Sequence, residues 1–192
     1  MTLPLDRDSV WELVLKYNSE KSDLNHYLES EAVCRALAER VGEDGDYFAI
    51  AGLIHDLDWG MTKNNPVDHL TKAPDMLREA GFSEEFIELI LSHGYGFDCA
   101  GLLDKKRTEK KQFILACGET ITGLIHSYAI MRNGIEGMEA KGLKKKYKDK
   151  KFAAGVSREI IQEIENLGLE MNEFFEIAIE AIKKIKDDVD LG

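Results

Sequence analysis

Apolar residues recur at spacings of three and four along most of the chain, which is the pattern of amphipathic helices. Leu, Ile, Ala, Glu and Lys are abundant, and only three prolines interrupt the pattern. No segment alternates apolar and polar residues convincingly enough for a strand. The sequence therefore predicts an all-α fold of helices joined by short loops.

The N-terminal half of the pattern predicts five helices. Asp8 or Ser9 caps the first, and Ser83, followed by two glutamates, caps the last. The third is apolar nearly all round and is therefore expected to be central and buried, whereas 59–67 is expected to be a loop. The five helices are predicted near residues 10–17, 23–41, 46–57, 69–80 and 83–91.

The C-terminal half follows a glycine-rich loop at 94–101. An apolar segment at 113–131 contains a single carboxylate, Glu119. Two amphipathic helices are predicted within 157–185, split at Gly168, and the acidic residues after them are expected to fray. We expect residues 1–192 to form one domain, a compact helical bundle, with the C-terminal helices at about 157–186 packed on it.

Composition narrows the class of protein. The 192 residues are 44% hydrophobic, which is enough for one real core. No apolar run approaches the ~20 residues of a membrane span, and the N-terminus lacks a signal-peptide pattern, so we expect a cytoplasmic protein without membrane contact. Three widely spaced cysteines are expected to be buried. A net charge of -11 makes nucleic acid an unlikely general partner. A homo-oligomer stays open.

Histidines and carboxylates carry the candidate chemistry. His55 and Asp56 lie together at the end of the predicted apolar helix, where both can reach one ion. His26 falls on the core face of its helix, and His69 and His93 begin or end others. Each histidine taken singly is more simply a hydrogen-bonded structural residue. Taken together, they favour a site for a divalent metal ion, because a cation satisfies buried imidazole and carboxylate groups at once.

The sequence resembles the HD superfamily and, within it, small bacterial and archaeal HDIG-type predicted hydrolases. The resemblance rests on four motifs: AGLIHDLDW at 51–59, DHL around His69, LSHG around His93, and KKKYKDKKFAAGVSRE at 144–159. It implies one or two divalent ions, with Mn, Fe, Zn, Ni and Mg all open. It implies as ligands His26, His55, Asp56 and Glu119 for one ion, with His69 and His93 for a second.

The chain departs from that subgroup at one position. The subgroup reads Asp-Glu-Leu-Thr-Gly where this chain reads ETITG, so that Glu119 replaces the distal aspartate. The extra methylene moves the carboxylate by more than ~1 Å, which would preserve metal binding while displacing the attacking water.

Other residues have two readings each. Asp58 either acts at the site, as the acceptor that orients a ligand histidine or, with Asp56, in acid-base catalysis, or is a loop carboxylate in solvent. His126 either approaches the cavity or packs, and packing is favoured. The lysine run 144–151 is either a solvated loop or an arm that holds phosphate, with Lys145, Lys148 and Arg158 as its cations.

The resemblance implies hydrolysis of a phosphate ester on a small phosphorylated molecule, with nucleotides as the first class to try. Two alternatives remain. The same ligands suit a di-iron oxygenase of the HD type. Alternatively, the chain is a degenerate HD module that senses a metal or another ligand without turnover, with Glu119 marking the lost catalysis.

Overall fold

The computed structural model describes residues 3–192, and every regular element within that range is helical, which confirms the all-α prediction. The elements, in chain order, are α1 (Arg7–Tyr17), α2 (Lys21–Arg40), α3 (Gly45–Ile54), α4 (Trp59–Thr62), η1 (Pro66–Asp68), α5 (Ala73–Glu79), α6 (Glu84–Ser92), α7 (Lys110–Arg132), α8 (Ala140–Lys148), α9 (Arg158–Gln162), η2 (Glu163–Leu167) and α10 (Met171–Lys183).

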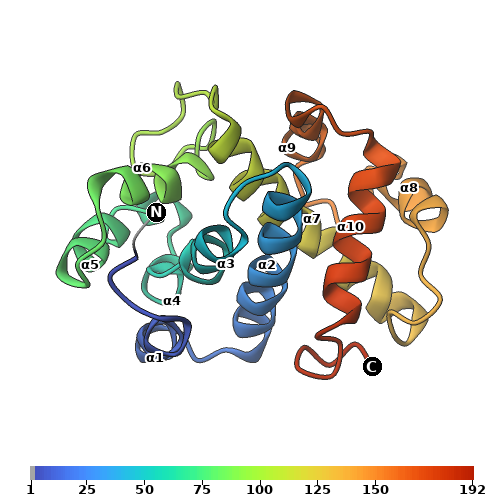
Figure 1. Cartoon of the computed structure of the whole chain (residues 1–192), viewed down its shortest axis with the longest axis horizontal. Helices are drawn as coiled ribbons and strands as arrows, with labels where there is room; N and C mark the ends of the chain where they lie inside the picture. Colours follow the sequence, from blue (N-terminus) through green and yellow to red (C-terminus); the bar gives the residue numbers. More distant parts are fainter. Residues whose placement is uncertain (1–2) are drawn as a thin grey trace.

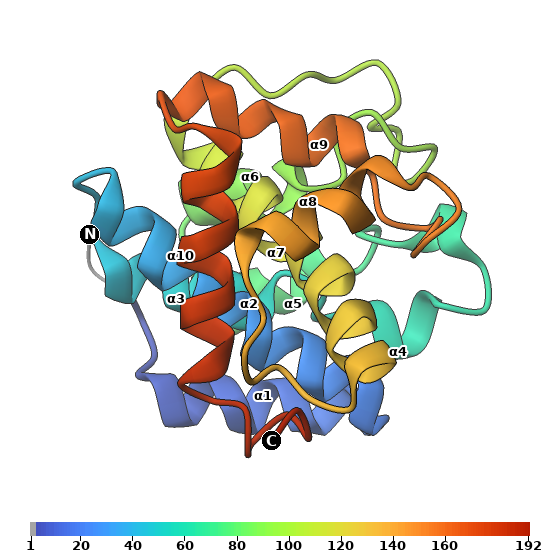
Figure 2. The ribbon, with the colours of Figure 1, turned by 90° about the vertical axis from the view of Figure 1, so that its right-hand side faces the viewer.

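Helices α2, α3 and α7 form the centre of the molecule. α2 packs along both α3 and α7, while α10 lies against α2 and α8 (Figure 1). α3 is buried on all sides, as its uniformly apolar sequence predicts, because it has neighbours around its whole circumference. The C-terminal helices α8 and α10 cover the side of α7 away from α5 and α6, as the turned view shows (Figure 2). One core of buried residues runs from α1 to the C-terminal tail.

The close approach of α2 and α3 depends on Gly52. A Cβ atom there would lie 2.5 Å from the Ser30 carbonyl oxygen, closer than van der Waals contact permits. The two helices can therefore pack this tightly only because Gly52 has no side chain.

Gly52→Ala is accordingly expected to lower the free energy of unfolding by about 1–3 kcal/mol, since backbone must move to make room for the methyl group. Chemical denaturation measures the change. Gly155→Ala is the matched control, because a Cβ at Gly155 meets nothing within 4 Å, and its effect is expected to stay within ~0.5 kcal/mol. Equal effects of the two substitutions would contradict the account of the α2–α3 contact.

Several predicted boundaries differ from the structure. α1 begins earlier than expected, because the Asp6 carboxylate accepts the Ser9 backbone N–H and caps the helix. His69 does not start a helix: it lies in the turn that follows η1, and α5 begins only at Ala73. The predicted loop 59–67 contains the short helix α4 and the start of η1.

The lysine run and the acidic tail, which was expected to fray, both pack against the rest of the chain. The lysine run 144–151 is largely the helix α8, because Leu143 is buried and Tyr147 packs against Phe175. The acidic tail is docked and not frayed. Val189 and Leu191 are buried in the core, and the Leu191 carbonyl accepts the Ile135 N–H.

The length and apolar composition of α7 would suffice to cross a membrane, contrary to the expectation that no run approaches this length. In the structure 61% of its most apolar 18-residue stretch is buried against other parts of the chain. That burial is what a core helix shows, and it explains the apolar composition of the segment without a membrane.

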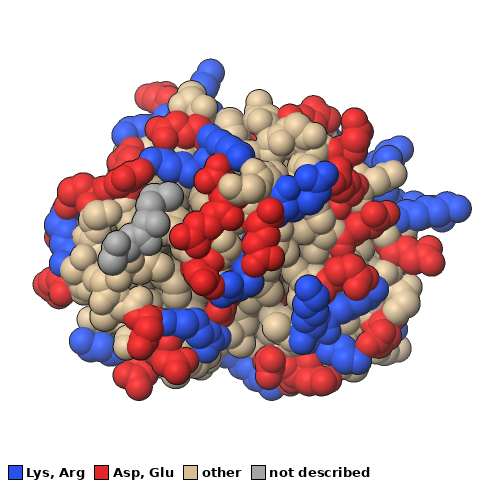
Figure 3. Space-filling view, in the orientation of Figure 1, with Lys and Arg blue, Asp and Glu red and all other residues tan. Residues whose placement is uncertain are grey.

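Charges on the face formed by α2 and α10 are mixed. Acidic and basic side chains alternate over it without a large area of one sign (Figure 3). The net charge of -11 therefore does not concentrate on this face.

Candidate metal centre

The end of α3 brings two candidate ligands to the centre of the molecule. His55 is the C-cap residue of α3 and is 1% exposed. Asp56 follows in the turn, and its Oδ1 lies 3.5 Å from Nε2 of His55. The helix terminus thus allows adjacent residues to face one point, as the sequence predicted.

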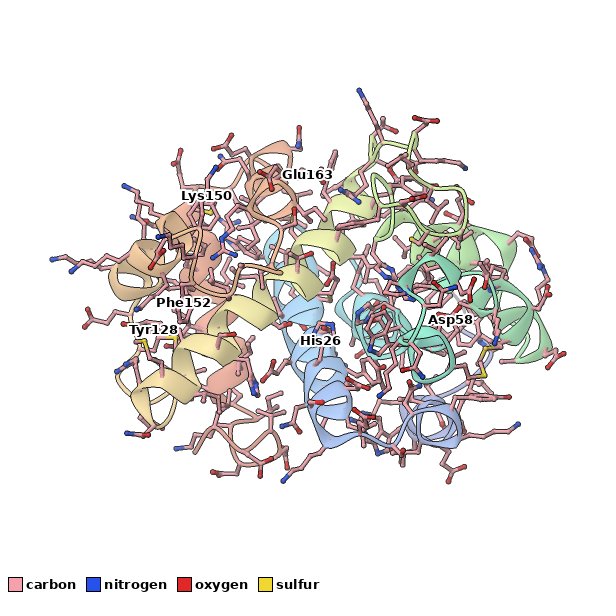
Figure 4. The ribbon with its side chains drawn as sticks, turned by 180° about the vertical axis from the view of Figure 1, so that it is seen from behind. His26, Asp58, Tyr128, Lys150, Phe152 and Glu163 are labelled. Atoms are coloured by element: carbon pink, nitrogen blue, oxygen red, sulfur yellow. The ribbon has the colours of Figure 1, made fainter. Side chains whose placement is uncertain are left out.

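His26 reaches the same point from α2. Its Nε2 atom lies 3.1 Å from Nε2 of His55, and its Nδ1 lies 2.9 Å from the hydroxyl of Thr122 on α7. Figure 4 shows His26 between the ribbons of α2 and α3, near the middle of the molecule. The group His26, His55 and Asp56 can hold one metal ion.

His69 and His93 complete a second group around the same carboxylate. Their Nε2 atoms lie 3.2 and 3.1 Å from Asp56 Oδ1 and 3.2 Å from each other. Asp56, His69 and His93 can therefore hold a second ion, with Asp56 shared between the two groups.

The hydrogen bonds on the far side of each ring show which nitrogen carries the proton. His55 Nδ1 faces the Gly52 carbonyl and His93 Nδ1 faces the Ile90 carbonyl, each at 2.7 Å, and carbonyls only accept. His69 Nδ1 faces the Asp58 carboxylate at 3.1 Å. The Nδ1 atoms of these three rings therefore donate, which leaves Nε2 as a lone pair in each neutral imidazole.

The same reasoning applies to His26. The Thr122 hydroxyl donates to the Glu119 carbonyl, so it accepts from His26 Nδ1. Two lone pairs then face each other at 3.1 Å between His26 and His55, and two more would meet at 3.2 Å between His69 and His93 if both of those rings were neutral. Such pairs repel unless positive charge lies between them.

A divalent metal ion is the cation that fits these donors. Ligand atoms at ~2.0–2.2 Å from one ion lie roughly 3.0–3.4 Å apart, and the measured separations fall in that range. A proton is a poor substitute at His55, because burial lowers the pKa of His55 to about 3. At His69, burial opposes the charged form, but Asp56 and Asp58 outweigh it and raise the pKa to about 10. A proton on His69 can therefore supply the positive charge at the His69–His93 group, whereas the His26–His55 group needs a metal ion for it.

Asp58 is fully buried and contacts His69 at Nδ1, the ring nitrogen that does not face Asp56. Its Oδ1 accepts from His69 Nδ1 and from the Leu70 N–H, and its Oδ2 accepts from the N–H groups of Lys72 and Ala73. Burial alone would raise the pKa of Asp58, but these donors, His69 first, hold it below its usual value. Of its two predicted roles, these contacts fit the orientation of His69 and not acid-base catalysis, since both oxygens are already occupied.

Asp58→Asn is expected to weaken metal binding at the His69–His93 group by about 10- to 100-fold, because the amide nitrogen cannot accept the hydrogen bonds that fix the loop and the ring. A metal titration monitored by calorimetry measures the affinity of each group. The affinity of the His26–His55 group should change much less. Unchanged affinity at both groups would show that Asp58 does not position His69.

Glu119 lies on α7 and lines the same pocket, but it is not one of the residues of the two groups. Its carboxylate accepts a hydrogen bond from the Thr120 hydroxyl. Burial raises the pKa of Glu119 to about 8, although the Thr120 hydrogen bond opposes the rise and the nearby Asp56 charge adds to it. Its assignment as a metal ligand stays a prediction.

The two groups open into a pocket of about 430 Å³. A larger groove of about 570 Å³ runs between α1, α2 and α10, but none of the histidines lines it. The pocket is lined by His26, Asp56, Trp59, Pro66, His69, His93, Gly94, Phe97, Asp98, Cys99, Glu119, Thr120, Gly123, Gly155, Val156 and Ser157.

The predicted phosphate-binding cations are not among these lining residues. Arg158 is engaged elsewhere: its guanidinium donates to five backbone carbonyls, those of Tyr147, Asp149, Phe152, Ala153 and Val156. Because this uses all five of its N–H groups, Arg158 has no free donor for a phosphate in this structure, and its assignment as a phosphate-binding cation stays a prediction. Arg158 shapes the loop that supplies Gly155, Val156 and Ser157 to the pocket wall.

Lys145 and Lys148 also lie away from the pocket lining. Both are exposed on α8. Lys150 and Phe152, in the segment that follows, appear in Figure 4 on the other side of α7 from Asp58. The lysine run therefore contributes no side chain to the pocket wall, and the role of Lys145 and Lys148 in holding phosphate stays a prediction.

His126 packs, as favoured from the sequence. Its Nδ1 lies 2.6 Å from the buried Glu29 carboxylate, which raises the pKa of His126.

Sequence reasoning missed Thr122 and Arg107. Thr122 was visible only as part of ETITG, and Arg107 only as one cation in a charged stretch. Arg107 forms a two-point ion pair with Glu163 of η2 and donates to the carbonyls of Ser92, His93 and Tyr95. It therefore ties the backbone at His93 to the C-terminal part of the chain; Figure 4 marks Glu163.

The HD domain family model matches residues 23–117 of the chain. The match contains all five residues of the two metal-binding groups and ends two residues before Glu119. No curated protein and no solved structure matches the chain.

Proposed function

The chain belongs to the HD superfamily, and from that membership together with the donor geometry we propose that it is a metal-dependent hydrolase that cleaves a phosphate ester at a two-ion centre. The observation that carries the proposal is the convergence of four imidazole Nε2 atoms in two close pairs, with the Asp56 carboxylate beside both. This arrangement is costly without cations and favourable with them.

Divalent ions at such a centre act as Lewis acids toward a phosphoryl oxygen and make water acidic enough to attack near neutral pH. The side chains of the protein would hold the ions and orient the ligand rings. Asp56 contributes to both groups, and its charge offsets that of the cations. Asp58 and the carbonyls of Gly52 and Ile90 fix the rings of His69, His55 and His93 through their Nδ1 protons.

Glu119 is proposed as a further oxygen ligand at the His26–His55 group. It lies three residues before Thr122, whose hydroxyl orients His26, so α7 serves this group from two positions. For Glu119 to bind an ion, its carboxylate must turn from the Thr120 hydroxyl toward the histidines.

A phosphate-ester screen tests the proposal. The full-length protein, reconstituted in turn with Mn, Fe, Zn, Ni and Mg, is assayed for phosphate release from nucleoside monophosphates and from simple phosphate monoesters. We expect release with at least one ion and loss of release on adding a chelator. No release from any ester by protein shown to contain metal would contradict the hydrolase proposal.

Glu119→Asp separates the hydrolase from the sensor. If Glu119 displaces the attacking water, restoring the shorter aspartate should raise the rate. Metal binding without turnover in both proteins would favour a sensor.

The four nitrogen donors and the shared carboxylate also suit two iron ions, which supports the di-iron oxygenase as the second candidate. An absorption spectrum that appears only with iron and changes with oxygen would favour it.

A further inference from the structure

The pocket in front of the metal centre is unusual in charge for a site that receives phosphate. Of the residues described, no lysine or arginine lines it. Three carboxylates do: Asp56, Asp98 and Glu119. Sites for polyphosphates surround the anion with Arg and Lys, because each further phosphate needs its own compensation.

Three cations of the chain are bound to other groups. Arg158 is saturated by backbone carbonyls, and Arg107 by Glu163 and three carbonyls. Lys63, which follows α4, pairs with Glu20 and Asp23. Among the described residues that line the pocket, no lysine or arginine offers positive charge to a substrate, which leaves this role to the ions.

The remaining wall is apolar. Trp59 packs edge-to-face on the His69 ring at 5.2 Å between centroids, so it stands directly beside one ligand. Phe97 is 48% exposed at the pocket although large apolar side chains are usually covered. Pro66 and Val156 belong to the same lining. Side chains of this kind bind an uncharged organic group, preferably a ring.

The size of the pocket points the same way. Ligand pockets span roughly 300–1,000 Å³, and 430 Å³ lies toward the lower end. The ions and one phosphoryl group take part of that space. What is left fits one ring system better than a nucleoside with a chain of phosphates.

We propose that the substrate is a monophosphate ester of an uncharged apolar alcohol or phenol, whose single phosphoryl group meets the ions while its organic part lies against Trp59 and Phe97. The proposal rests on the proposed function, and it assigns specificity to these two side chains and to Asp98, which disfavours a second anionic group. Polyphosphates and acidic phosphate esters are poor ligands on this account.

Stable phosphonates test the proposal without relying on turnover. Calorimetry measures binding of methylphosphonate, phenylphosphonate and 4-carboxyphenylphosphonate to the full-length, metal-loaded protein. We expect phenylphosphonate to bind at least ~10-fold more tightly than methylphosphonate, because the ring buries apolar surface. The added carboxylate is expected to cancel most of that gain.

Three variants assign the effect to residues. Phe97→Ala should remove much of the preference for the phenyl group. Leu103→Ala is its matched control, since Leu103 belongs to the same loop and is 56% exposed but does not line the pocket. Asp98→Asn should restore binding of the carboxylated ligand.

The outcomes distinguish a wrong substrate class from a wrong hydrolase function. Equal affinity for methyl- and phenylphosphonate, or a preference that Phe97→Ala and Leu103→Ala change alike, would overturn the proposed substrate class while leaving a phosphate-binding metal centre intact. If metal-loaded protein bound none of the phosphonates, the proposed hydrolase function itself would fail, and the substrate class with it.

Discussion

Asp56→Asn is expected to reduce phosphate-ester hydrolysis by about 10³-fold or more. Asp56 Oδ1 lies within 3.5 Å of three imidazole nitrogens, so a single charged oxygen serves both metal-binding groups. An amide is a weaker metal ligand and does not offset the cationic charge, and the loss of several kcal/mol of Lewis-acid stabilisation corresponds to a factor of this size. Steady-state rates and metal content, measured on the same preparations, check the prediction.

Asp98→Asn provides the control for this substitution. It makes the same chemical change in the same pocket but outside the two metal-binding groups. Its metal content should equal that of the unmodified chain. If Asp56→Asn kept full metal content and full activity, the shared-carboxylate arrangement would not be the catalytic centre.

Arg107→Ala is expected to lower the free energy of unfolding by about 3–5 kcal/mol, more than any other substitution considered for its effect on stability. The Arg107 side chain is 5% exposed, and its removal leaves the Glu163 carboxylate and three backbone carbonyls without their donor. A partly buried charge that loses its partner is costly, unlike an exposed one. For a chain of this length the midpoint of thermal unfolding should fall by roughly 10 °C.

Arg78→Ala is the matched control, because Arg78 also pairs with a glutamate through two nitrogens, yet its side chain is 47% exposed. Its loss is expected to change the stability far less than the loss of Arg107, because an exposed ion pair is screened by solvent. Thermal and chemical unfolding of the two variants are compared directly. Equal effects would mean that Arg107 does not hold the end of α6, where His93 lies, against η2.

The sequence predicted elements best where local signals and tertiary packing agree. Ser83 and the glutamates after it placed the start of α6 correctly, and the uniformly apolar third helix proved to be the buried one. Prediction was wrong where long-range contacts decide. Residues 69–72 stay non-helical because Asp58, eleven or more residues earlier, takes up their side-chain and backbone donors.

Residue types and spacing were enough to name the histidines and Asp56 as candidates. They did not reveal the direction of each lone pair, since that depends on acceptors such as Gly52 and Thr122, which carry no metal signal themselves. Nor did they reveal that Arg158 is saturated by carbonyls of its own loop, because an arginine in a basic stretch looks the same whether it binds phosphate or backbone.

Metal content tests the central claim most directly. The chain is reconstituted with divalent metal, desalted and analysed by elemental mass spectrometry, beside a His55→Ala, Asp56→Ala double variant and a His126→Gln control whose histidine pairs with Glu29 outside the centre. We predict one to two ions per chain in the unmodified protein and the control, and loss of metal in the double variant. Protein that stays metal-free after reconstitution, or a double variant that keeps its metal, would contradict the account.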